Sequence, residues 1–158
     1  MSKLVDIVVD KINKNVPLHE QTSYDRIHAD LGHPEAEHRI NVFSDYDDNE
    51  ITPDHLNKAL DDSDWRIRYR AAYHPSASSD NIHKALSDSD VAVRTAALEN
   101  PNVHTEHISK ALNDLDATVR FDAVNHPKAT PENLRVAIKD SSQDVRHSAV
   151  DKLYSILK

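Results

Sequence analysis

A segment of 26 residues occurs four times in related form, with no insertion or deletion between the copies. The second copy contains the stretch IHKALSDSDVAVRTAALENP, residues 82–101, and its apolar, Asp, Arg, Ala and Pro positions return in the other copies. A fixed period of this length is typical of stacked arrays, in which one unit is too small to bury an apolar face alone. The period constrains the fold more than any other feature of the sequence.

The pattern within each copy predicts two short helices. Capping residues begin the first helix, and apolar residues at i, i+3 and i+4, such as Leu56, Ala59 and Leu60, face inward. An Asp-Ser-Asp corner begins the second helix, which buries Ile67 and Ala71. Asn-Pro or His-Pro ends the second helix in three copies. The expected first-helix caps are Thr52-Pro53, Ser78-Ser79, Thr105 and Thr130-Pro131.

The sequence therefore predicts an all-α fold, a right-handed α-solenoid of four two-helix repeats with helical N- and C-terminal caps. The repeat units are expected at 52–77, 78–103, 104–129 and 130–158. The last unit lacks the proline, so its second helix should continue through Tyr154, Ile156 and Leu157. Whether one helix of each unit is partly 3₁₀ stays open.

Residues 1–51 are expected to form an acidic helical cap with a linker, since they hold five basic and eleven acidic residues. One helix is predicted around Leu4–Ile12, and a second over about Ser23–Leu31, with Gly32 as its C-terminal stop. A third short segment follows His33-Pro34, and Ile40, Val42 and Phe43 are its expected buried residues.

Composition excludes several classes of function. The chain has no cysteine, which excludes disulfides, cysteine-ligated zinc and iron–sulfur clusters. The first residues offer no apolar signal-peptide region and no stretch is long enough to span a bilayer, so a cytoplasmic location is expected. The net charge of −8 argues against nucleic acid as a general partner.

The pattern Leu-x3-Leu-x-Asp-x-Asp-x2-Val-Arg-x2-Ala-x3-Asn-Pro resembles the leucine-rich repeat variant family, and equally the short HEAT-like repeats. The resemblance covers Thr52–Lys158, about two thirds of the chain. It implies a helical scaffold. Some HEAT-like proteins are DNA glycosylases or chromophore lyases, but no motif here carries either activity over.

Four arginines recur at one position of the repeat: Arg68, Arg94, Arg120 and Arg146. They could present a row of cations to phosphates, or pair with Asp side chains and corner carbonyls of their own and the adjacent unit. Three aspartates lie four residues before their arginines, which is an ion-pair spacing on a helix: Asp64, Asp90 and Asp116. The structural role is favoured.

Two metal interpretations are weaker than their alternatives. The acidic stretch Ser44–Glu50 lacks the glycine and the glutamate of an EF-hand loop, which favours a solvated turn. His104-x2-His107 and His33-x4-His38 have ligand-like spacing without a well-placed third ligand. His and Asn also interchange at two repeat positions, which indicates hydrogen bonding at helix ends. No metal or cofactor is predicted.

The first unit departs from the others at Trp65, Tyr69 and Tyr73, which lie at i, i+4 and i+8 of a helix. Arg66 and Arg70 lie alongside. Trp, Tyr and Arg are enriched in interface hot spots, so these five residues are the candidate binding site for a protein partner. The alternative is that residues 1–51 fold over this face.

The sequence thus predicts a non-catalytic scaffold that binds another protein, of unknown oligomeric state. One alternative is a role linked to nucleic acid, through DNA binding by the arginine face or through acidic mimicry that inhibits a basic partner. A second alternative is an enzyme of the HEAT-like glycosylase or lyase kind. No Gly-rich phosphate loop, cysteine nucleophile or Ser-centred elbow motif is present, so no catalytic residue is predicted.

Overall fold

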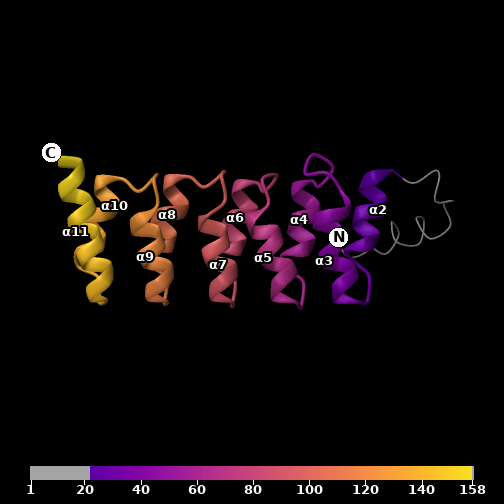
Figure 1. The fold of residues 1–158 in the computed structure, drawn as a ribbon, viewed down its shortest axis with the longest axis horizontal. Coiled ribbons are helices and arrows are strands. Elements are labelled where there is room, and N and C mark those ends of the chain that lie inside the picture. The colour runs from indigo at the N-terminus through magenta and orange to yellow at the C-terminus, as the bar shows by residue number, and fades with distance from the viewer. Residues whose placement is uncertain (1–21, 158) are drawn as a thin grey trace, which may run out of the picture.

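A computed structural model describes residues 22–157, and over this range the chain forms ten α-helices and no strand (Figure 1). The expected all-α fold class is confirmed. The helix predicted around Leu4–Ile12 lies outside the described residues. The helices are α2 (Ser23–Asp30), α3 (Ala36–Asp45), α4 (Pro53–Ala59), α5 (Trp65–Tyr73), α6 (Ser79–Ala85), α7 (Val91–Leu98), α8 (Thr105–Ala111), α9 (Ala117–Asn125), α10 (Pro131–Ala137) and α11 (Gln143–Leu157).

The helices from α4 onward alternate between two rows (Figure 1). The first row, α4, α6, α8 and α10, begins at residues 53, 79, 105 and 131, in steps of 26. The second row, α5, α7, α9 and α11, begins at residues 65, 91, 117 and 143, with the same step. Each second-row helix packs on the next one along the chain. The sequence period is therefore the period of the helix pairs.

The first-row helices begin at capping side chains, as expected. The Thr52 Oγ1 accepts from the His55 amide, and the Ser78 Oγ accepts from the Asn81 amide at 3.2 Å. Thr130 does the same in α10. The third copy differs from the prediction, because its N-cap is His104 and Thr105 is the first residue inside the helix.

No 3₁₀ helix occurs over residues 22–157. The first-row helices end instead in a tight turn, in which the amides of Asp61 and Asp62 donate to the carbonyls of Lys58 and Ala59. The amides of the next unit make the same turn. This turn brings the chain to the corner where the second helix begins.

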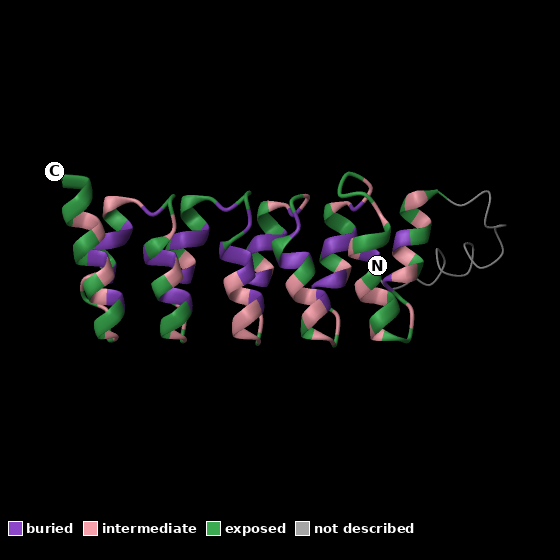
Figure 2. Ribbon diagram, in the orientation of Figure 1, coloured by how far each residue is buried: buried purple, intermediate pink, exposed green. Residues whose placement is uncertain are grey.

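One apolar core runs along the array between the two rows (Figure 2). The predicted inward positions Leu56, Ala59, Leu60, Ile67 and Ala71 are all buried. Two further core positions were not predicted, at the end of the second helix and in the loop after it. They are occupied by Ala72, Leu98 and Val124, and by Ala77, Val103 and Ala129.

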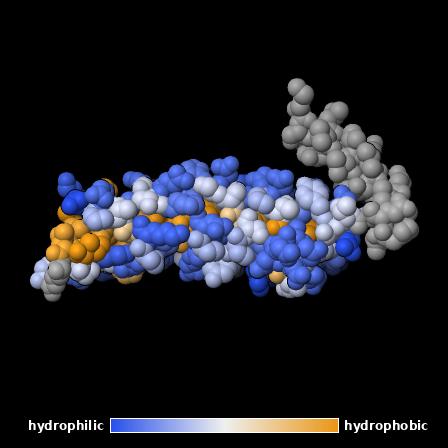
Figure 3. All heavy atoms as spheres, turned by 90° about the horizontal axis from the view of Figure 1, so that it is seen from above, coloured by the Kyte–Doolittle hydropathy of each residue, from blue (hydrophilic) through white to orange (hydrophobic). Residues whose placement is uncertain are grey.

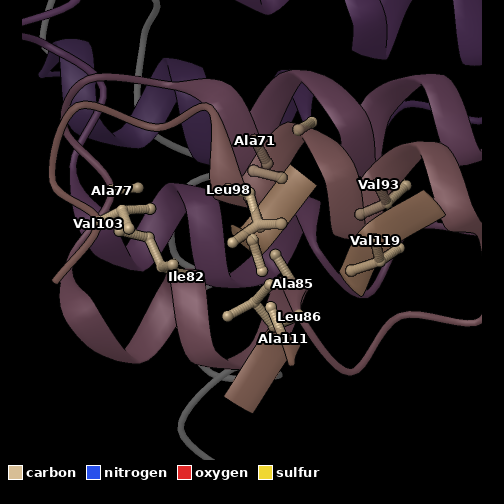
Figure 4. Close-up of a cluster of buried hydrophobic side chains, with 14 of the residues drawn as sticks. Ala71, Ala77, Ile82, Ala85, Leu86, Val93, Leu98, Val103, Ala111 and Val119 are labelled. Carbon is tan, nitrogen blue, oxygen red and sulfur yellow. The ribbon is translucent and has the colours of Figure 1, made fainter. Parts of the chain in front are cut away.

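The core is formed between units as well as inside them. Figure 4 shows Val93 and Val119, equivalent residues of successive units, lying together, and Val103 lying against Ala77 of the preceding unit. A helix of seven to nine residues is marginal by itself in water. Burial against the neighbouring pair therefore supplies the stability that one pair lacks.

Helices α2 and α3 extend the array at its N-terminal end (Figure 1). The helix predicted over about Ser23–Leu31 is confirmed as α2, which Leu31 caps. Gly32 is not a left-handed stop, because no described glycine has a positive φ. A Cβ on Gly32 would lie 3.2 Å from the Ala29 carbonyl and 3.4 Å from the Lys58 Nζ, so its small size permits a close approach.

The third predicted segment is the ten-residue helix α3, and its Val42 is buried in the core. Ile40 and Phe43 are partly buried against the same cluster. At the other end of the array, α11 continues to Leu157, as the missing proline predicted. No helix within the described range is both long and apolar enough to cross a membrane.

Candidate functional site

The aromatic stripe of α5 consists of Trp65, Tyr69 and Tyr73. Trp65 is 46% exposed and Tyr73 is 50% exposed, whereas Tyr69 packs partly against the core. The rings of Trp65 and Tyr69 meet edge-on, with centroids 6.3 Å apart. The stripe therefore offers two accessible rings, and one of them, that of Trp65, contacts a third ring that packs against the core.

The local sequence fixes the direction of this stripe. Asp64 is the N-cap of α5, and its Oδ1 accepts from the Arg66 amide at 2.9 Å. Ile67 and Ala71 of the same helix are fully buried, so they turn one face of α5 toward the core. Trp65 and Tyr73 therefore lie on a solvent-exposed face of α5.

The two arginines beside the stripe differ in their partners. The Arg66 guanidinium binds the Asp64 carboxylate at 2.7 Å and Glu37 of α3 at 2.8 Å. Hydrogen bonds from the Arg66 side chain and amide lower the pKa of Asp64 to about 2. Arg70 is exposed, and no ion pair holds it within residues 22–157. One cation at the stripe is therefore neutralised and the other is accessible.

The described part of the N-terminal segment lies beside α5 without covering the stripe. Helix α3 packs against α5 and supplies Glu37 to Arg66, as an acidic cap over basic residues would. Trp65 and Tyr73 nevertheless keep about half of their surface exposed. The part of the expected cap before residue 22 lies outside the described residues.

A shallow groove between α3 and α5 borders Trp65 and is lined by Pro34, Arg39, Asp64 and Arg66 among others. It brings an exposed tryptophan next to a carboxylate, which is the arrangement that an enzyme of the glycosylase kind would need. The carboxylate is that of Asp64, which is bound to Arg66 and has a pKa of about 2. A carboxylate with that pKa is a weak base, so it suits neither general acid nor general base catalysis at neutral pH.

The recurring arginines join each helix pair to the next. The Arg68 Nε lies 2.7 Å from Asp88 Oδ2, and its Nη2 lies 3.0 Å from Asp88 Oδ1. Its Nη1 donates to the carbonyls of Asp62 and Ser63 in the preceding corner. Two further pairs repeat this arrangement: Arg94 with Asp114, and Arg120 with Asp140.

The predicted partners Asp64, Asp90 and Asp116 do not hold these arginines. Asp90 and Asp116 accept from the amides of Ala92 and Thr118 as N-caps, just as Asp64 accepts from Arg66. Their carboxylates are committed to the first turn of their own helix. The first aspartate of the next corner, such as Asp88, accepts an amide within its own corner and also binds the arginine of the preceding unit, so the ion pair crosses between units.

These pairs are largely buried and affect both partners. Burial alone would raise the pKa of Asp88, but hydrogen bonds from Arg68 and from the Asp90 amide outweigh it and hold this pKa below its ordinary value. The hydrogen bond to Asp88 raises the pKa of Arg68. Because aspartates hold these arginines, the row leaves few free cations that could bind phosphates.

The sequence period missed one member of the row. Arg39 of α3 binds Asp62 through Nε at 2.6 Å and Nη2 at 2.8 Å, and its Nη1 donates to the carbonyls of His33 and Pro34. It lies 29 residues before Arg68, so a strict step of 26 does not find it. A signal was present, since Arg39 follows its corner at the same short distance as Arg68.

The interchange of His and Asn has a common geometry at the third residue of the first-row helices. The His55 Nδ1 accepts from the Thr52 amide at 3.1 Å, and its Nε2 lies 3.2 Å from the Tyr24 carbonyl. Asn81 makes the same two links, to the Ser78 amide and the Pro53 carbonyl. These side chains tie one unit to the preceding unit, which supports the interpretation as hydrogen-bonding residues.

His104, Glu106 and His107 place three ligand atoms within 4.8 Å of one another, and they are the only such trio over residues 22–157. Glu106 was not recognised as a third ligand from the sequence. The buried His107 accepts from the His104 amide at Nδ1, so its proton is on Nε2, which faces the Ser79 carbonyl at 3.3 Å. A metal ion would have to break one of these bonds.

The first two residues of the acidic stretch Ser44–Glu50 belong to the end of α3, and residues 46–50 form the expected turn. The Glu50 amide donates to the Asp47 carbonyl at 2.9 Å, and the Ser76 hydroxyl donates to the Asp48 carbonyl. No trio of carboxylates converges in this stretch within the described part of the chain. The turn therefore fastens the α3–α4 connection to the loop after α5.

Comparison with models of known protein families and with curated protein sequences gave no match.

Proposed function

We propose that this protein is a non-catalytic scaffold of the leucine-rich repeat variant or HEAT-like kind, a right-handed α-solenoid whose second-row face binds another protein in the cytoplasm. The exposure of Trp65 and Tyr73 carries this proposal. The equivalent positions in the later units hold smaller or polar residues: Val91, Ala117 and Gln143 for Trp65, and Glu99, Asn125 and Asp151 for Tyr73. The array does not need aromatic rings there, so their role lies outside the array.

The chemistry of the stripe suits a protein partner. Two half-exposed rings with an accessible guanidinium beside them are the residue types that dominate interface energetics. Binding would bury Trp65 and Tyr73, and Arg70 would then find a carboxylate or a carbonyl on the partner. The anchored Tyr69 keeps the neighbouring Trp65 oriented before binding, which lowers the entropy that association costs.

The test is site-specific photo-crosslinking from the Tyr73 position, in an extract of the cells that make the protein. A photo-reactive phenylalanine at Asn125, the same helix position two units later, is the matched control. We expect adducts of defined mass from position 73 alone, reduced at least tenfold by Trp65→Ala. The same adducts from both positions, or no effect of Trp65→Ala on a folded variant, would refute the proposal.

The alternatives have less support. DNA binding by the arginine face requires free cations, whereas Arg68, Arg94 and Arg120 are each held by an aspartate. Acidic mimicry would have to use exposed carboxylates such as those of Asp47 and Asp48, because those of Asp88 and Asp140 are held in the same pairs. Titration with duplex and single-stranded DNA at low salt tests the first alternative, and we expect binding no tighter than about 100 μM.

A further inference from the structure

The outer face of α11 exposes a position that every earlier unit buries. Val150 is 51% exposed, whereas its equivalents Ala72, Leu98 and Val124 are at most 2% exposed. Ile138 is likewise only partly buried against the core, although its counterparts in the earlier units are buried. In the earlier units these positions are covered by the next helix pair. The outer face of α11 therefore exposes apolar positions that a further helix pair covers elsewhere in the array.

An apolar stripe continues this face along α11. Val150, Tyr154 and Leu157 follow at i, i+4 and i+7, and all three are exposed large hydrophobic residues. Figure 3 shows apolar side chains gathered at the C-terminal end of the array, whereas most of the remaining visible surface is polar. Exposed apolar residues in a cluster mark an interaction site more strongly than single ones do.

Arg146 gives this face a specific polar feature. Its Nη1 donates to the carbonyls of Asp140 and Ser141, as the equivalent arginines do in their own corners. At Arg68 and Arg120 the Nε and Nη2 then hold the carboxylate of the next unit. No carboxylate binds the Nε and Nη2 of Arg146 anywhere in residues 22–157. The donors are fixed in place and have no acidic partner.

We propose that the stripe of Arg146, Val150, Tyr154 and Leu157 docks an acidic amphipathic helix of another polypeptide. A carboxylate just before the first turn of that helix binds the Arg146 guanidinium in the way that the Asp140 carboxylate binds the Arg120 guanidinium. The apolar face of the helix covers Val150 and Leu157, as α11 covers Val124. This surface is separate from the stripe on α5, so the inference goes beyond the function proposed above.

A second copy of the chain is a poorer occupant. In a head-to-tail contact, Arg146 would face the first corner of the array in the second copy. The residue of that corner that corresponds to Asp62 is His33, which has no carboxylate. In a symmetric contact between two α11 helices, the stripe would bring together two arginines and no acidic residue. Neither arrangement supplies the carboxylate, whereas an acidic helix does.

The experiment measures binding of a fluorescent, helix-stapled peptide to the full chain by anisotropy. The peptide carries Asp-Leu-Asp followed by residues 117–127, which is the corner and second helix of the third unit. We expect saturable binding, weakened more than tenfold by Arg146→Glu and unchanged by Arg135→Glu, an exposed arginine on α10. A peptide with Lys for its first Asp should restore binding to the Arg146→Glu variant.

Absence of binding at 1 mM peptide, or equal loss with both arginine variants, would overturn the proposal. Sedimentation analysis covers the other occupant, because a dimer of the chain that Val150→Asp dissolves would assign this face to a second copy. Trp65→Ala is expected to leave peptide binding unchanged. Failure of the α5 stripe and failure of the α11 face therefore give different results.

Discussion

Equivalent positions of the repeat are buried at the junction between α9 and α11 but exposed on the outer face of α11. At the junction Arg120 holds Asp140 through two hydrogen bonds and Val124 is fully buried. On the outer face Arg146 has no acidic partner among the described residues, and Val150 is half exposed. Similar residues thus become core or surface according to whether another helix pair follows.

The largest difference between junction and end is expected in the core. Leu98→Ala should lower the free energy of unfolding by about 3 kcal/mol, because it opens a cavity between units. Val150→Ala, at the same position of the last unit, should change it by less than about 0.5 kcal/mol. Urea denaturation followed by circular dichroism measures both. Equal losses would mean that the end face is covered in solution.

A smaller difference is expected for the arginines. Arg94→Gln should destabilise by about 2 kcal/mol, because it leaves the carboxylate of Asp114 buried without its charged partner. Arg146→Gln removes only bonds to two backbone carbonyls and should cost less than about 1 kcal/mol. The same denaturation measurement compares them. A large cost at Arg146 would indicate a carboxylate partner outside the described range.

The smallest effect concerns acid. Burial lowers the pKa of His107, so the folded protein keeps it neutral while the unfolded chain takes up a proton below about pH 6.5. Stability is then complete above that pH and falls as the pH decreases. His107→Asn copies the residue at Asn81 and Asn133, and it should reduce the loss between pH 7.5 and 5.5 by about 1 kcal/mol. Identical pH profiles for variant and wild type would contradict a neutral, buried His107.

The sequence predicted the inward positions of the helices well, because those positions repeat. Leu56 and Ile67 carry apolar side chains with helical spacing in every copy, and both are buried. It also predicted that the arginines pair with corner carbonyls and with aspartates of their own or the adjacent unit, but it did not predict which aspartate. Asp64 precedes Arg68 by four residues, yet the bond goes to Asp88, twenty residues later. Helical spacing cannot show which of two nearby carboxylates is already committed to capping a helix.

The candidate site shows the same division. The departures at Trp65 and Tyr73 were visible in the sequence, because the other copies lack aromatic rings there. Their accessibility was not, since burial depends on where the N-terminal helices pack. The structure also separates Tyr69, which is anchored in the protein, from the two exposed rings. Trp65 and Tyr73 are therefore the residues to mutate.

The sequence alone determined the period, the helix pairs and most of the apolar positions, since these follow from local spacing and capping. The tertiary structure decided two features that the period does not show. Arg39 joins the arginine row from a differently spaced helix, and Arg146 has no carboxylate partner among the described residues. The physical reason is that the arginine pairs and part of the burial arise between units. They depend on the neighbour that each helix meets, which no single copy of the repeat encodes.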